Sequence, residues 1–177
     1  IFNQSGPMTM GASQVCGFIK SDPSKATPNL QFHVQPISTD ILGATKMHDF
    51  DGITPTIANI RPTSRGEINI ASNDTRDNPK IKMNYLSTQD DRDVAAKALK
   101  IVRKIMLSTE TFKKYEPEEY RPGSNITDDE ELVKAASEHS QTIFHPVGTC
   151  KMGSGDEAVV NDKLSAHGIQ NLRIVDA

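Results

Sequence analysis

Residues 81–107 read IKMNYLSTQDDRDVAAKALKIVRKIML, and the spacing of apolar residues changes from two to 3.6 within this stretch. Before Thr88, apolar residues alternate with polar ones from Ile81 to Tyr85, which predicts a strand. After Thr88 the apolar positions fall on one helical face, which predicts an amphipathic helix to about Leu107. The residues expected to form its buried stripe are Val94, Ala98, Ile101, Val102 and Ile105.

The sequence upstream of this stretch contains further strand patterns. Residues 30–35 alternate apolar and polar side chains between two prolines, which is typical of a half-buried strand. Residues 53–61 form a second extended run that ends at Pro62, and alternation resumes at residues 67–70. Because only a short turn separates these two runs, the sequence predicts that they form a hairpin.

Downstream of the long helix, the sequence predicts a second, shorter helix. Thr127 and Glu130 have the spacing of a capping box, and the helix after them should end near His139. A glycine-rich, irregular region follows, and residues 172–175 then resemble a strand. Antiparallel strands followed by helices predict an α+β fold, with one antiparallel sheet and helices packed on one face.

Composition excludes several classes of protein. The 177 residues carry 20 basic and 23 acidic side chains, a net charge of −3 with no basic stripe, so we expect no nucleic-acid partner. No apolar run reaches the length of roughly 18 residues that a transmembrane helix needs. The 2 cysteines, Cys16 and Cys150, are far apart and form no CxxC pair, which excludes a disulfide framework and a four-cysteine zinc site. We expect reduced thiols, with a single bridge as the alternative, and no metal site.

The densest chemical patch is residues 142–153, which include the run HPVGTCKMG from His145 to Gly153. Pro146 has no N–H and a fixed φ, so His145 is expected at a rigid corner. Gly148 allows the backbone to approach a flat or bulky ligand closely. From these residues alone, a structural histidine beside a turn is the simpler interpretation, and a ligand-binding histidine is the alternative. Composition does not decide between them.

Other roles for the histidines have weaker support. A metal site built from His145 and Cys150, with His139 or His167, lacks the short ligand spacings that zinc sites show. A Cys–His nucleophile pair lacks an oriented third residue. The remaining histidines, His33 on the polar side of a strand and His48 in a loop, are expected to be solvated or at an edge.

The run from His145 to Gly153 resembles the active-site motif of the glucose–methanol–choline (GMC) oxidoreductases. Within that family, its sequence is most similar to that of bacterial choline-dehydrogenase-like members. Residues 167–169 and 171–177 resemble the closing segment of that family, in which the chain returns to the flavin. Further similarity to its substrate domain lies in residues 6–7, 18–19, 21–23, 31–33, 62–66 and 84–87, and in Ile68, Ser72 and Asp74. The resemblance therefore spans nearly the whole chain.

The resemblance implies an FAD-dependent enzyme that oxidises the CH–OH group of a small alcohol by hydride transfer to the flavin. His145 would be the catalytic base, and Pro146, Val147, Asp176 and Ala177 would contact the cofactor. A second catalytic His or Asn is expected beyond Ala177. For the location we expect a cytoplasmic or membrane-peripheral protein.

The same resemblance implies how the chain is divided. Residues 1–170 would form the substrate-binding domain, including the His145 loop at 142–153, and residues 171–177 would begin the return to the FAD domain. The G-x-G-x-x-G turn that binds the FAD pyrophosphate is absent from the sequence, so the missing FAD domain is the expected partner. The chain alone is therefore expected to be inactive and to bind FAD weakly or not at all.

Two alternatives from other functional classes stay open. A cyanohydrin lyase of the same flavin fold would keep the base without hydride transfer. A stand-alone binding module would have lost catalysis, although the retained His145 motif argues against that interpretation.

Overall fold

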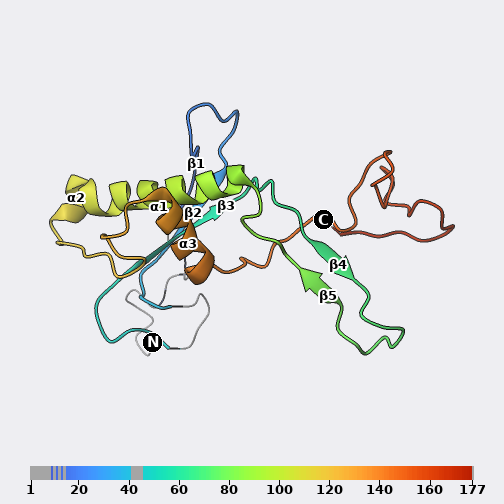
Figure 1. Ribbon diagram of the computed structural model, residues 1–177, viewed down its shortest axis with the longest axis horizontal. Coiled ribbons are helices and arrows are strands. Elements are labelled where there is room, and N and C mark those ends of the chain that lie inside the picture. Colours follow the sequence, from blue (N-terminus) through green and yellow to red (C-terminus); the bar gives the residue numbers. More distant parts are fainter. Residues whose placement is uncertain (1–8, 10, 12, 14, 41–45, 177) are drawn as a thin grey trace. The chain divides into compact units, whose positions relative to one another are not determined.

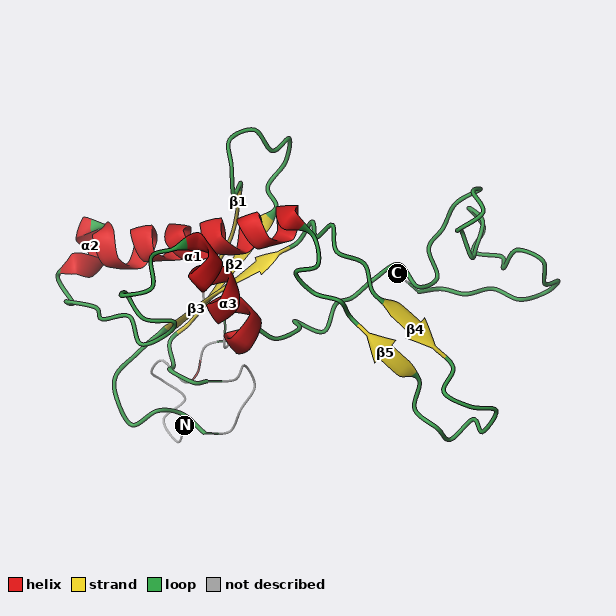
Figure 2. Ribbon diagram, viewed as in Figure 1, coloured by secondary structure: helices red, strands yellow, loops and turns green. Residues whose placement is uncertain are grey.

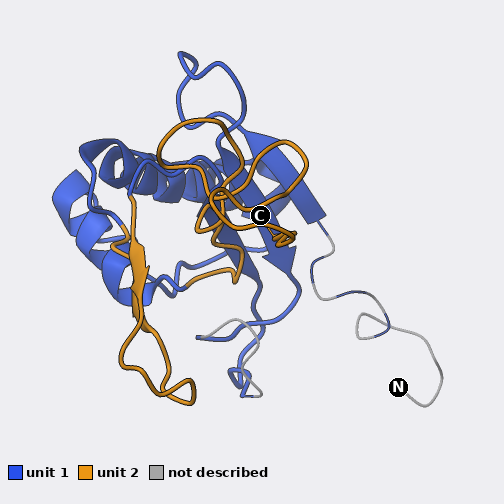
Figure 3. Cartoon of the chain, turned by 90° about the vertical axis from the view of Figure 1, so that its right-hand side faces the viewer, with its two compact units in different colours: residues 1–64, 86–141 blue, residues 65–85, 142–177 orange. Residues whose placement is uncertain are grey.

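The computed structural model describes residues 9, 11, 13, 15–40 and 46–176. Its elements, labelled in Figure 1, are β1 (Val15–Ile19), β2 (Leu30–Gln35), β3 (Thr54–Asn59), β4 (Glu67–Asn69), β5 (Lys80–Lys82), α1 (Gln89–Ser108), α2 (Glu110–Lys113) and α3 (Asp129–His139). They confirm the predicted α+β class. The chain divides into two compact units: the first comprises residues 1–64 and 86–141, and the second comprises residues 65–85 and 142–177 (Figure 3).

The first unit is built on a three-stranded antiparallel sheet with the order β1-β2-β3. In the central strand, Phe32 lies opposite Gly17 of β1 and Ile57 of β3. Leu30 and Phe32 point to the same face because side chains alternate along a strand, and both are buried. The strand predicted at 30–35 is thus confirmed, whereas β1 was not predicted.

Helix α1 covers the apolar face of this sheet. Leu30 packs there against Val94 and Ala98, and half-buried Ile101 lies beside them. The helix also contacts α3, and Figure 2 shows the two helices next to each other. The predicted limits of the long helix and the burial of its first half are therefore confirmed.

The second half of α1 is less buried than predicted. Ile105 is 37% exposed and lines an open apolar hollow of about 240 Å³ with Val15 and Gly17. Glycine offers no side chain to pack against the helix at this end of the sheet. The predicted burial of Ile105 is therefore wrong, and Met106 is buried instead.

The hairpin predicted between residues 53–61 and 67–70 is also wrong. Strand β3 pairs with β2, while β4 pairs with β5 in a separate two-stranded sheet in the second unit. The described strands therefore form two sheets instead of the single one predicted. The chain leaves the first sheet after Asn59, where Pro62 has no N–H to donate and Asp91 binds the next backbone amides.

Two other local predictions need correction. Asp128, not Thr127, is the N-cap of α3, and its Oδ1 accepts hydrogen bonds from the backbone N–H groups of Glu130 and Glu131 at 2.9 and 3.1 Å. Residues 172–175 form no regular strand, because Arg173 makes a single β-bridge with Ser165.

Asp91, in the first turn of α1, joins the helix to the segment that follows β3. It is only 4% exposed, and its carboxylate accepts hydrogen bonds from Asn59 Nδ2 at 3.2 Å, Thr63 N at 2.9 Å and Ser64 N at 2.8 Å. Burial opposes ionisation of this carboxyl, but the hydrogen bonds from Ser64 and Thr63 outweigh it and lower its pKa. The ionised form is therefore the one that stabilises the fold.

We expect Asp91→Ala to reduce the free energy of unfolding by about 2 kcal/mol at neutral pH, because three part-buried N–H donors lose the charged acceptor that they share. A pKa lowered on folding stabilises the protein above the ordinary carboxyl range, and this contribution is lost as the pH falls through the lowered value. The difference between wild type and variant should therefore shrink in acid. Urea unfolding of both proteins at neutral and acidic pH measures it.

The neighbouring Asp90→Ala is the matched control. Asp90 makes one ion pair with Lys25 at 2.7 Å, and its side chain is 45% exposed, so its removal should cost less than about 1 kcal/mol. Equal losses in the two variants would show that the buried hydrogen bonds of Asp91 are not the cause.

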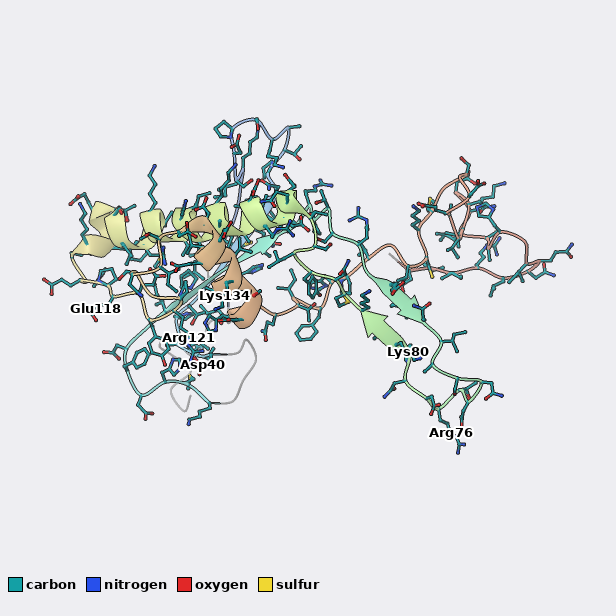
Figure 4. The ribbon with its side chains drawn as sticks, in the orientation of Figure 1. Asp40, Arg76, Lys80, Glu118, Arg121 and Lys134 are labelled. Atoms are coloured by element: carbon teal, nitrogen blue, oxygen red, sulfur yellow. The ribbon has the colours of Figure 1, made fainter. Side chains whose placement is uncertain are left out.

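Polar contacts also fix the long loops of the first unit. Arg103 on α1 pairs with Glu119 through contacts of 2.8 to 3.1 Å and donates hydrogen bonds to the carbonyl oxygens of Gly123 and Ile126. In Figure 4, Asp40 and Arg121 lie side by side, and their charged groups are 2.9 Å apart.

No described helix is both long and apolar enough to cross a bilayer.

Candidate active site

His145 lies on an exposed loop of the second unit, at residues 142–153. Its imidazole makes no hydrogen bond or ion pair with the described parts of the chain. Phe144, the preceding residue, has a φ of 63°, and its N–H donates to Thr142 Oγ1 at 3.0 Å. A bulky residue adopts this left-handed conformation only where the surrounding chain enforces it, so His145 lies at a sharp, constrained bend.

The residues next to His145 present an apolar surface to solvent. Phe144 is 73% exposed and Val147 is 72% exposed. Gly148 has a φ of 104° and open space where a side chain would be, so the backbone on this side can approach a ligand. The loop thus combines a titratable imidazole with apolar side chains suited to a flat ring.

The end of this loop is held by a folded segment around Val160, which is 1% exposed. The N–H of Gly153 donates to the carbonyl of Val160 at 2.9 Å, and the N–H of Val159 donates to the carbonyl of Lys151 at 3.0 Å. Asn161 Oδ1 accepts hydrogen bonds from the backbone N–H groups of Lys163 and Ser165, which closes the next turn. The loop therefore ends at a segment that is well held by hydrogen bonds.

The predicted cofactor contacts lie in two parts of the chain. Pro146 and Val147 are exposed on the His145 loop, and Asp176 is exposed near the end of the described chain. Ala177 lies outside the described residues. The contacts of these residues with a cofactor remain predictions.

His48 differs most from what the sequence predicts. Its side chain is 18% exposed, with Nδ1 2.9 Å from Ser38 Oγ and Nε2 3.1 Å from Asp40 Oδ1. Its ring stacks on Phe50 with centroids 4.9 Å apart and meets the edge of Tyr120. The prediction of a solvated His48 is therefore wrong.

The cysteines and the other acidic or imidazole side chains suggest no metal centre. Both Cys16 and Cys150 are free thiols, and Cys16 is exposed. Across the described ranges, no group of three or more His, Cys, Asp or Glu side chains is placed to bind a metal ion.

Comparison with known proteins connects this loop to a family. The family model for GMC oxidoreductase matches residues 62–177, which include the whole His145 loop. The oxygen-dependent choline dehydrogenase of Proteus mirabilis (strain HI4320) is 36% identical over 177 residues, which cover 100% of this chain and 32% of that protein.

Two solved structures share the fold. Pyridoxine 4-oxidase from Mesorbium loti superposes with a TM-score of 0.78 at 24% identity, covering 94% of this chain and 33% of that one. A formate oxidase variant from Aspergillus oryzae RIB40, solved to study FAD modification, gives a TM-score of 0.83 at 23% identity, covering 99% and 35%. The chain spans about a third of the length of each relative, and by its family match it belongs to the GMC oxidoreductases as a C-terminal portion.

Proposed function

We propose that this chain is the substrate-domain part of an FAD-dependent oxidoreductase that converts the CH–OH group of a small alcohol to a carbonyl, with His145 as the base. The observation that carries the proposal is the exposed imidazole of His145, whose backbone lies at the bend between Phe144 and Pro146. Family membership and the choline dehydrogenase relative support the oxidoreductase class.

The surroundings of His145 fit a flavin. A flat ring system is partly apolar and needs contact surfaces of the kind that Phe144 and Val147 expose. Pro146 and Val147 on this loop, with Asp176 and Ala177 at the chain end, are the residues proposed to hold it. When bound, FAD supplies the acceptor for the hydride that the alcohol carbon loses.

His145 manages the proton in this reaction. Oxidation of the alcohol carbon releases one hydride and one hydroxyl proton, and a ring nitrogen of His145 takes the proton as the C=O bond forms. An imidazole suits this task because it changes charge near neutral pH. The bend at Phe144 and the rigid Pro146 limit the backbone conformations at His145, so less backbone entropy is lost when the alcohol binds.

The rest of the flavoenzyme is the proposed partner of this chain, because the sequence has no glycine-rich turn for the pyrophosphate. Apolar side chains that are exposed in the second unit support this proposal, because contact with the rest of the flavoenzyme would cover them. They include Ile70 at 87%, Val175 at 78% and Ile81 at 60% exposure. The location of the whole protein, cytoplasmic or membrane-peripheral, is part of the same proposal.

The test is anaerobic addition of a small alcohol, choline first, to the full-length protein. We expect the bound flavin to be reduced and one equivalent of the aldehyde to form. A flavin that stays oxidised while a cyanohydrin is cleaved would contradict the proposal and indicate a lyase. Failure of both reactions with a panel of small alcohols would indicate a binding module.

A further inference from the structure

A second histidine of the same unit is bonded to the loop that carries His145. Nε2 of His167 lies 3.0 Å from the carbonyl oxygen of Gly153. A carbonyl oxygen only accepts hydrogen bonds, so Nε2 carries the proton and donates it. The backbone N–H of His167 also donates to the carbonyl of Val159 at 3.0 Å. His167 is therefore held by two hydrogen bonds, one from its backbone N–H and one from its ring.

Gly153 is the point at which the His145 loop joins the folded segment. Its N–H donates to the carbonyl of buried Val160, and its own carbonyl accepts from His167. Both backbone polar groups of this one residue are thus fixed. The N–H belongs to the peptide unit before Gly153 and the carbonyl to the unit after it, so the two hydrogen bonds together restrict φ and ψ at Gly153. The hydrogen bond from His167 thereby helps to set the direction in which the loop leaves the segment.

Near the opposite end of the loop, the Phe144 N–H donates to Thr142 Oγ1, a contact within the loop that shapes the bend before His145. His145 lies between this bend and Gly153 and has no hydrogen-bond partner of its own in the described parts of the chain. Its position consequently depends on the bend and on the backbone at Gly153. We propose that His167 is a positioning residue, which keeps the loop in the form that presents His145 to the substrate; this rests on the function proposed above for His145.

This role differs from that of an alternative base. If His167 were the base, its second nitrogen, Nδ1, would have to accept the proton, because Nε2 donates to Gly153. A positioning residue takes up no proton in the reaction. Loss of the ring should therefore slow the reaction without removing the ionisation that controls it.

The test compares His167→Gln, whose amide can still donate, with His167→Leu, which cannot, in the full-length holoenzyme. We expect His167→Leu to lower kcat about tenfold, the effect of one lost hydrogen bond on positioning, with little change in KM. His167→Gln should recover most of that loss. Both variants should keep the pH profile of the wild type.

Hydrogen exchange gives a readout that needs no turnover. In His167→Leu, amides of residues 144–155 should exchange faster, and in His167→Gln they should be close to wild type. The matched control is His139→Leu, because His139 is an exposed histidine at the end of α3 in the first unit. This control should change neither kcat nor exchange in the loop.

Three outcomes would overturn the proposal. His167→Leu could retain wild-type kcat and exchange, His167→Gln could be as impaired as His167→Leu, or the controlling ionisation could vanish with His167→Leu. If His145→Ala itself keeps full turnover, the proposed function fails. If His145→Ala is inactive and His167→Leu is not, only the positioning role fails.

Discussion

Replacing His145 with Ala in the full-length protein is expected to lower kcat by roughly 10² to 10⁴, the usual contribution of a positioned base. The bound FAD should remain, because the imidazole is exposed on its loop and supports no other described contact. Steady-state kinetics with the alcohol, together with the flavin content of the purified variant, measures both quantities.

His139→Ala is the control for this experiment, since it removes an exposed imidazole from the end of α3. It should leave kcat within about twofold of wild type, because surface substitutions have small effects. A structural role for His145 would have a different signature: lower stability or loss of flavin, with turnover per bound flavin unchanged. That result would refute the assignment of the base.

The second large effect is expected in the core of the first unit. Leu30 is 0% exposed and packs against Val94 and Ala98, so Leu30→Ala removes buried methyl groups and leaves a cavity. We expect the free energy of unfolding to fall by about 2 to 5 kcal/mol. Urea unfolding, followed by the helical circular dichroism of α1 and α3, measures the change.

Ile105→Ala is the matched comparison, because Ile105 lies on α1, the helix that packs on Leu30 of β2, but is 37% exposed. Its replacement should cost less than about 1 kcal/mol, since little area returns to water. If Leu30→Ala costs no more than Ile105→Ala, the contact of Leu30 with Val94 and Ala98 is not the core of the first unit.

The extents of β2, β3, β4, α1 and α3 could largely be predicted from the sequence, but strand pairing could not. Alternation marks residues 54–59 and 67–69 as extended whichever strand they pair with. What separates them is the side chain of Asp91, which binds backbone N–H groups 27 and 28 residues away. No local pattern reports such a contact. Strand β1 was missed because Gly17 interrupts its apolar run and one neighbour, Phe18, stays exposed.

The candidate site shows the same division. The residues of the His145 loop are contiguous, so the motif was visible in the sequence. The left-handed backbone conformation of Phe144 could not be predicted, because a bulky residue carries no sequence signal for that conformation. The surroundings of His48 depend on Tyr120, which is distant in the chain, so only the folded structure brings them together.

The most direct test of the account is the rate of flavin reduction by the alcohol, measured anaerobically by stopped flow in the full-length protein over about pH 5 to 9, the range that includes imidazole ionisation. For the wild type, the account predicts a rate that rises with pH through one ionisation and then levels, because the base must be unprotonated to accept the hydroxyl proton. For His145→Ala it predicts a slow rate without that ionisation. An equally fast rate with the same pH dependence in His145→Ala would contradict the account.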